Sequence, residues 1–177
     1  MLIALITISI ILCIYSDLTR SNGVSFSRTV KSLAKDSTFN LLFDSGCKST
    51  DSYGSNNCQF NWGSLVSGYF SGKLGHDLQQ GSKFSVNFKV DKFISWKFTC
   101  AACGANCTTT IPVIDQEVTF ATPPCPISAT EVIKQIFNST LPVDSPTPVK
   151  VTATGDVILT DASNNNIIDL YLDITIQ

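Results

Sequence analysis

Residues 82–100 have the sequence SKFSVNFKVDKFISWKFTC. From Phe84 to Cys100 every even position except Lys92 is apolar, and the odd positions are polar except for Phe93. This period of two predicts β-strand with one buried face and one solvated face. A single strand of this length would reach roughly 60 Å, which is too long for a small domain. We therefore expect two strands that share a face, separated by a bend or a tight turn at residues 90–93.

The shared face is unusually aromatic. It carries four large rings, those of Phe84, Phe88, Trp96 and Phe98. Taken alone, an apolar stripe of this kind is most simply a packed core. Four rings on one face are nevertheless more than an ordinary sandwich core uses, so we also consider that they line a binding site.

The rest of the chain has the same β character. Glutamate occurs only twice, whereas Ser, Thr, Val, Ile and Phe are abundant. Residues 64–74 form a strand pattern whose glycines indicate bulges or a close backbone approach. Residues 149–159 and 168–176 alternate on either side of the turn DASNNN, which predicts a terminal hairpin. About seven short strands of this kind predict an all-β fold, an immunoglobulin-like β-sandwich of two sheets stapled by disulfides.

Several segments carry weaker patterns. Residues 17–37 are polar and predict either a short helix or a flexible extension, and residues 39–43 predict the first strand. Residues 44–57 (DSGCKSTDSYGSNN) have turn chemistry throughout and predict a loop. Residues 129–137 fit a short helix or a strand, and the β context favours strand. Residues 141–148 contain three prolines and predict an extended linker.

The chain begins MLIALITISIILCIYS and becomes polar at Asp17. The apolar run is shorter than the ~20 residues that span a bilayer, and the small residue Ser16 ends it. We interpret residues 1–16 as a secretory signal peptide, with an uncleaved membrane anchor as the alternative. The mature protein is then expected outside the cell or in the endolysosomal lumen.

Cysteine usage agrees with that compartment. Cys13 leaves with the signal peptide, and an even number of cysteines in a secreted chain implies up to three disulfides, with fifteen possible pairings. Asn106 and Asn138 begin sequons and are candidate glycosylation sites, Asn138 being the better because the sequon of Asn106 has a cysteine inside it. The cysteines that remain are Cys47, Cys58, Cys100, Cys103, Cys107 and Cys125.

Little in the sequence indicates catalysis or charge-driven binding. The net charge is -2 with no basic run, so nucleic acid is not an expected partner. The spacing of Cys100, Cys103 and Cys107 matches a metal-ligand set, but an oxidising compartment consumes thiols as disulfides and no histidine stands nearby. The single histidine, His76, lies in a glycine-flanked turn beside Asp77 and is interpreted as a solvated turn residue. We expect no enzyme, no metal, no cofactor and no catalytic residue.

The order of motifs adds a resemblance. It runs from Phe-Asp-x-x-Cys at residues 43–47 through Phe-x-Cys at 98–100, Cys-Pro-Ile at 125–127, Leu-Pro at 141–142 and Pro-x-Pro at 146–148 to a Val-x-Val…Asp…Asn hairpin. This order resembles the ML family, the MD-2-related lipid-recognition domains. Its members include Niemann-Pick C2-type sterol carriers, the GM2 ganglioside activator and phosphatidylglycerol/phosphatidylinositol transfer proteins. The resemblance implies that residues 17–42 form an N-terminal extension with the first strand, and that residues 43–177 form the lipid-recognition domain.

One departure from the family concerns its disulfides. The family's final-strand cysteine, bonded to the first one, is absent from residues 167–177. Cys47 is therefore expected to pair with Cys58, and the other four cysteines among themselves.

The resemblance implies a lipid site between the two sheets. It would hold a sterol or the tail of a phospholipid or glycolipid in a monomer that makes transient contact with a membrane surface. A recognition or adhesion sandwich with a solid core is the alternative, and a hydrolase would need His76 beside a serine and an acid. The expected lining is Phe84, Val86, Phe88, Ile94, Trp96, Phe98, Val118, Phe120, Val151, Leu170 and Leu172.

Overall fold

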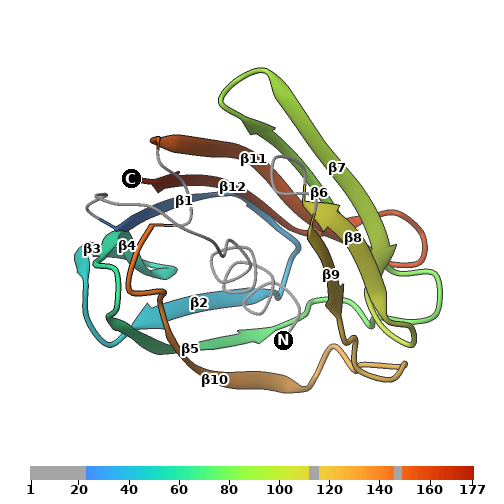
Figure 1. Ribbon diagram of the computed structural model, residues 1–177. Coiled ribbons are helices and arrows are strands. Elements are labelled where there is room, and N and C mark those ends of the chain that lie inside the picture. The colour runs from blue at the N-terminus through green and yellow to red at the C-terminus, as the bar shows by residue number, and fades with distance from the viewer. Residues whose placement is uncertain (1–22, 112–115, 146–148) are drawn as a thin grey trace.

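The computed structural model describes residues 23–111, 116–145 and 149–177, and in that part every regular element is a β-strand (Figure 1). The expected signal peptide lies outside the described residues. Twelve strands are described, where the sequence predicted about seven. They are β1 (Val24–Leu33), β2 (Thr38–Phe43), β3 (Cys47–Asp51), β4 (Gly54–Phe60), β5 (Leu65–Lys73), β6 (Lys83–Val90), β7 (Ile94–Ala101), β8 (Cys107–Ile111), β9 (Gln116–Phe120), β10 (Val132–Thr140), β11 (Val151–Thr160) and β12 (Asn166–Ile176).

The strands form two layers that face each other (Figure 1). One layer contains β10, β5, β2 and β4, with β3 paired to β4, and the other contains β1, β12, β11, β6 and β7. The predicted all-β, disulfide-stapled sandwich is therefore confirmed. Its layers share one continuous ladder, because β1 pairs with β4 where Val24, Ser25 and Phe26 meet Phe60, Gln59 and Cys58.

The join between the layers is one-sided. Strands β10 and β7 stand at the two ends of the strand order, so the described strands pair across the layers only at β1 and β4. Strands β8 and β9 form a separate two-stranded sheet, which Figure 1 shows at the opposite side of the molecule from β3 and β4.

Residues 83–101 form the β6–β7 hairpin. Val90 pairs with Ile94, and Asp91 and Lys92 make the turn with φ angles of 48° and 67°. The prediction of two strands sharing a face is confirmed, because the paired residues Phe88 and Trp96 are both buried. The two strands are joined by a tight turn, and the alternative of a bend within one long strand is not observed.

Two segments differ from the sequence-based expectation. Residues 24–33, expected to form a short helix or a flexible extension, form β1 between β4 and β12. Residues 47–51 and 54–60, most of which were expected to be loop, form the β3–β4 hairpin. The polar residues of this hairpin bond to one another: Asn57 Nδ2 donates to Ser49 Oγ at 2.8 Å, and Ser49 Oγ donates to the carbonyl of Asn56 at 3.2 Å. Strands rich in turn-forming residues are stable here because their side chains find partners across the hairpin.

Other predictions are confirmed. Residues 132–140 are a strand, β10, and the terminal hairpin is β11–β12. The glycines of β5 mark a close backbone approach, since a Cβ at Gly68 would stand 2.0 Å from the carbonyl oxygen of Leu42 on β2.

Three disulfides join Cys47 to Cys58, Cys100 to Cys107 and Cys103 to Cys125. This is the partner expected for Cys47, and the other four cysteines are bonded among themselves. The first disulfide crosses the β3–β4 hairpin, and the other two gather β7, β8 and the segment before β10 at one end of the sandwich. In the described part of the chain, no cluster of three or more His, Cys, Asp or Glu side chains is arranged as a metal site. The same residues include no helix of the length and apolarity needed to cross a bilayer.

Candidate functional site

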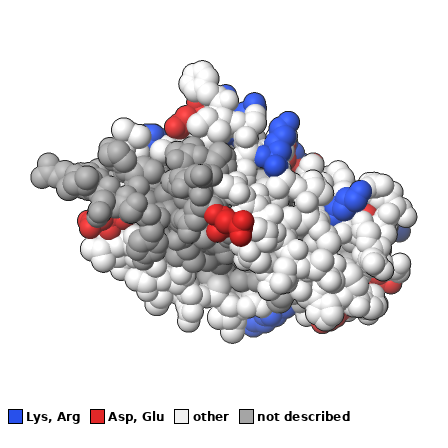
Figure 2. Space-filling model, turned by 45° about the vertical axis from the view of Figure 1, so that its right-hand side comes forward, with Lys and Arg blue, Asp and Glu red and all other residues white. Residues whose placement is uncertain are grey.

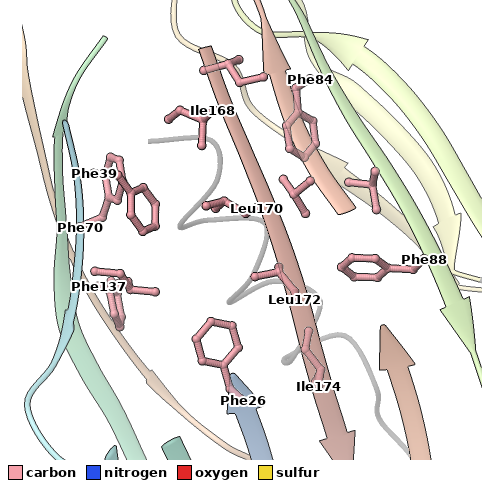
Figure 3. Packing of buried hydrophobic residues seen from close by; sticks show 14 of the residues in the cluster. Phe26, Phe39, Phe70, Phe84, Phe88, Phe137, Ile168, Leu170, Leu172 and Ile174 are labelled. Carbon is pink, nitrogen blue, oxygen red and sulfur yellow. The ribbon is translucent and has the colours of Figure 1, made fainter. Parts of the chain in front are cut away.

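The space between the layers is bounded by apolar side chains. Figure 3 shows Phe39, Phe70 and Phe137 pointing from one layer toward the other, whose side chains include Phe84 and Phe88. All five are at most 7% exposed. The central strand β12 adds Ile168, Leu170, Leu172 and Ile174, each at most 2% exposed. This inner surface offers dispersion contacts and apolar area.

The structure places most of the predicted lining residues on this inner surface. Val118 and Phe120 lie on β9, but their side chains are outside the described residues. Ile94 is 42% exposed at the start of β7, and Phe98 and Val151 are half-buried. The remaining six are buried: Phe84, Val86, Phe88, Trp96, Leu170 and Leu172.

Sequence reasoning omitted the facing layer. Phe39, Leu41, Phe70 and Phe137 are buried on β2, β5 and β10, yet none was among the expected lining residues. The signal for them is weaker because β2 has only six residues, and glycines in β5 and polar residues in β10 interrupt their inner faces. The alternation of Phe39 and Leu41 with polar or half-buried neighbours was the pattern available in the sequence.

The aromatic rings pack in two groups, one for each layer. On β6 and β7, Trp96 packs tilted against Phe98 at 5.1 Å between ring centroids and edge-on against Phe88 at 6.0 Å. On the other layer, Phe39 packs against Phe70 at 5.4 Å, and Phe43 against Phe137 at 5.4 Å. An aromatic contact also joins the two layers, because Phe43 of β2 packs edge-on against Phe26 of β1 at 5.9 Å between ring centroids.

One glycine fixes the position of Phe88. Gly155 of β11 pairs directly with Phe88 of β6. A Cβ at Gly155 would stand 2.6 Å from Cδ1 of Phe88 and 2.0 Å from the carbonyl oxygen of Asn87. Because Gly155 has no side chain, the Phe88 ring can lie against the sheet at this position. There the ring covers the backbone of Gly155.

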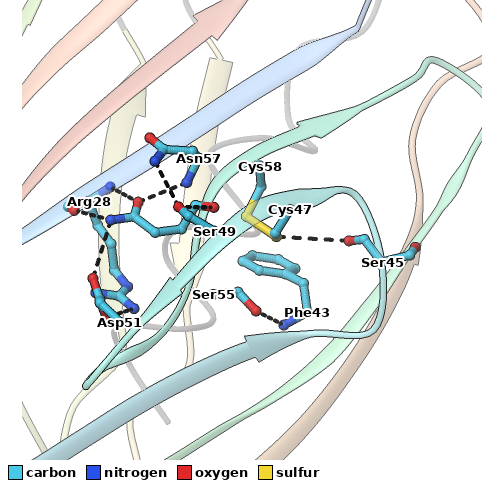
Figure 4. The surroundings of a disulfide bond; sticks show 10 residues. Arg28, Phe43, Ser45, Cys47, Ser49, Asp51, Ser55, Asn57 and Cys58 are labelled. Atoms are coloured by element: carbon cyan, nitrogen blue, oxygen red, sulfur yellow. Dashed lines mark hydrogen bonds and ion pairs between the residues drawn. A yellow bond between two sulfur atoms is a disulfide. The ribbon is translucent and has the colours of Figure 1, made fainter.

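A buried arginine lies at the join between the layers. Arg28 of β1 has a fully buried side chain, and Nη2 and Nη1 donate to the two carboxylate oxygens of Asp51 at 3.0 and 3.3 Å (Figure 4). The guanidinium carbon also lies 5.6 Å from the ring centroid of Phe39 and 6.0 Å from that of Tyr53. Asn56 completes the junction, with its amide bonded to the backbone N–H and carbonyl of Arg28.

The environment of Asp51 shifts its pKa. Burial alone would raise the pKa of this carboxyl, but hydrogen bonds from Arg28, from the backbone N–H of Tyr53 and from Asn56 outweigh it and hold the pKa below the usual value. The pairing of Arg28 with Asp51 was not predicted from the sequence. Val24, Phe26 and Arg28 alternate with serines, which is the pattern of a strand. Because Arg28 is charged, this pattern did not stand out as the apolar face of a strand.

Two buried donors near the inner surface lack an acceptor among the described residues. They are Nε1 of Trp96, whose side chain belongs to the β6–β7 aromatic group, and Nε of Arg28. Trp96 is only 5% exposed. A buried N–H group without an acceptor is unfavourable, so a bound molecule that supplies an oxygen here would be stabilised.

Two depressions on the outer surface differ from this interior. The larger, about 780 Å³, lies over the disulfide Cys103–Cys125 and is lined by Gln80, Thr122 and Asn106 among others. The smaller, about 280 Å³, lies over β1, β4 and β12 and is lined largely by polar residues. Asn106 and Asn138, the candidate glycosylation sites, are both exposed.

His76 lies close to the carboxylate of Asp161, which already accepts hydrogen bonds from other residues. Its Nδ1 lies 3.4 Å from Oδ2 of Asp161. Asp161 accepts hydrogen bonds from the side chain and backbone of Asn165 and from the backbone N–H of Ser163, and these, with nearby His76, hold its pKa below the usual value. Within the described residues no serine hydroxyl is hydrogen-bonded to His76. The arrangement is that of a turn closed by a carboxylate.

Comparison with known proteins gives little further information. No family model and no curated protein sequence matches this chain. Among solved structures, the fold is similar to that of chicken MD-1, determined in complex with lipid IVa. The two chains are 10% identical over 89% of this chain and 94% of that one, with a TM-score of 0.44. At this level of similarity, neither ligand nor function can be transferred to this chain.

Proposed function

We propose that this protein binds a lipid between its two layers, without catalysing a reaction on it. The observation that carries the proposal is the apolar inner surface, which both layers contribute while being paired along one side only. Because β7 and β10 are unpaired with each other, the layers can separate between these two strands without breaking ladder hydrogen bonds, while the Cys103–Cys125 disulfide and the Leu78–Ile127 bridge hold the neighbouring segments together. Acyl chains or a sterol ring system would then gain burial at about 25 cal/mol per Å² of apolar area.

The unpaired donor of Trp96 narrows the class of ligand. A pure hydrocarbon would leave Nε1 without an acceptor, whereas an ester carbonyl or a hydroxyl oxygen would accept its hydrogen bond. We therefore favour a lipid with an oxygen close to its apolar body, such as a phospholipid, a glycolipid or a sterol. The three disulfides and the two exposed sequon asparagines support a secreted or endolysosomal location for this binding.

A recognition module with a solid core remains the second candidate. It is favoured by one observation, namely that Phe84, Phe88 and Leu172 are at most 1% exposed in the chain as it stands. In that case the interior would contribute stability only, and binding would belong to the outer loops. The two candidates differ in whether a lipid chain contacts Trp96.

Fluorescence of Trp96 tests this difference. A Trp62→Phe variant leaves Trp96 as the single tryptophan, at the cost of the hydrogen bond from Trp62 Nε1 to the carbonyl of Gln177. The protein is incubated with vesicles of phosphatidylcholine carrying brominated acyl chains, then separated from them. We expect strong quenching of Trp96 emission, because bromine quenches only in contact.

The matched control is Trp96→Phe, which leaves Trp62 as the reporter beside the C-terminus. Its emission should be unchanged by the same treatment. If Trp96 is not quenched, the lipid-carrier proposal is wrong and the solid-core recognition module takes its place.

A further inference from the structure

We propose that the tip of the β6–β7 hairpin is a docking site for anionic membrane surfaces. This goes beyond the proposed binding of a lipid in the interior and does not depend on it. The tip, defined here as residues 89–97 with residues 149 and 150, combines exposed apolar side chains with four lysines.

The apolar part of the tip is unusually exposed. Phe93 is 88% exposed, Ile94 42% and Val149 64%. These are three of the seven large hydrophobic residues exposed in the described part of the chain, and they lie at the same end of neighbouring strands, since Val90 of β6 pairs with Ala153 of β11. An isolated exposed hydrophobic residue needs no explanation, but a cluster indicates an interaction surface.

The charge around the tip is positive on a chain whose net charge is -2. The only acid within the tip is Asp91, whose carboxylate accepts hydrogen bonds from the backbone N–H and the hydroxyl of Thr152 at 2.8 and 3.1 Å. Figure 2 shows blue side chains below the projection at the top of the molecule, which is the β6–β7 turn at the top of Figure 1. The four exposed lysines are Lys89, Lys92, Lys97 and Lys150.

The turn holds Phe93 firmly in this position. The backbone N–H of Asp91 donates to the carbonyl of Thr152 at 2.7 Å, and that of Phe93 to the carbonyl of Val90 at 3.2 Å. Asp91 and Lys92 both have positive φ, which is unfavourable for residues other than glycine. The turn therefore consists of charged and apolar residues at positions where the sequence Asn-Gly would adopt the same backbone conformation more easily.

A membrane surface fits this combination better than a protein partner does. Lysines attract anionic head groups while an aromatic side chain inserts at the boundary with the acyl chains. The inner face of the same hairpin continues from Val90 to Phe88 and Trp96. A docked tip would therefore place the apolar interior next to the bilayer.

Co-sedimentation of the mature protein with vesicles tests the proposal. The probes are phosphatidylcholine vesicles with and without about one-third phosphatidylserine. We expect binding to the anionic vesicles, weakened by salt. Phe93→Asp should lower the affinity at least about tenfold, because it removes the inserting ring and adds a negative charge. Lys92→Ala should lower it about fivefold.

Ile136→Asp on β10 is the matched control. Ile136 is 69% exposed in the opposite layer, and its substitution should leave vesicle binding unchanged. The proposal is overturned if the wild-type protein does not distinguish the two kinds of vesicle, if Phe93→Asp binds like wild type, or if Ile136→Asp loses as much. Quenching of Trp96 by brominated lipid delivered from cyclodextrin instead of vesicles reports on the interior alone, so failure of the tip and failure of the interior site are distinguishable.

Discussion

Replacing Asp51 by asparagine should destabilise the protein measurably. The substitution keeps an oxygen that accepts from the backbone N–H of Tyr53, but it removes the charge that pairs with the fully buried guanidinium of Arg28. Removing one partner of a fully buried pair costs about 3–5 kcal/mol. Since the Asp51 side chain is 42% exposed and water can reach the site, we expect a smaller loss of about 2 kcal/mol in the free energy of unfolding.

The assay is urea unfolding with the disulfides intact, supported by thermal melting, where the loss corresponds to a fall in Tm of roughly 4–8 °C for a chain of this size. Adding Arg28→Met to Asp51→Asn should recover most of the stability, because an apolar side chain replaces an unpaired buried cation. An Asp51→Asn variant as stable as wild type, or a double variant no more stable than Asp51→Asn alone, would refute the reasoning.

The pairing of Asp51 with Arg28 also makes the stability of the protein depend on pH. The folded-state pKa of Asp51 is lowered, so its contribution is fully present above the unfolded-state pKa of 3.8 and is lost as the pH falls through the folded-state value. The difference in stability between wild type and Asp51→Asn should therefore be constant near neutral pH and vanish in strong acid.

Three further predictions concern stability. Gly68→Ala should cost about 2–3 kcal/mol in urea unfolding, because its Cβ would stand 2.0 Å from the carbonyl oxygen of Leu42; an unchanged midpoint would show that β2 and β5 can separate freely. Replacing Cys47 and Cys58 together by serine should cost about 3 kcal/mol, the value for opening a loop of this length, and a much smaller loss would indicate a structured unfolded state. Asp169→Asn should raise Tm at pH 7, since burial and nearby Asp156 raise the pKa of Asp169 and the charged form therefore opposes folding above that pKa; a lower Tm would contradict this sign.

The sequence predicts the parts of this fold whose side chains alternate without interruption. The β6–β7 hairpin could be predicted because its even positions are apolar on both sides of a short polar break, and the β11–β12 hairpin for the same reason. Six of the expected lining residues come from these two hairpins and are buried.

The remaining elements depend on side-chain partners that their own sequence pattern does not show. Strand β1 was missed because Arg28 interrupts its apolar face, and that buried charge is stabilised by Asp51 on β3 and by the rings of Phe39 and Tyr53. The β3–β4 hairpin was missed because Ser49, Asn56 and Asn57 favour turns unless their side chains bond to one another. Local propensity does not show these contacts, because the Arg28–Asp51 pair joins residues from separate strands and the hairpin contacts form only once β3 and β4 are paired.

Native mass spectrometry would show whether the interior of this protein holds a lipid. The protein would be purified without detergent from cells that express it, weighed intact, and then extracted with organic solvent to identify any lipid. We predict a mass excess corresponding to about one lipid per chain, and a ligand with an oxygen near its apolar body. A protein that has only its own mass, and keeps it after incubation with sterol and phospholipid vesicles, would contradict the claim.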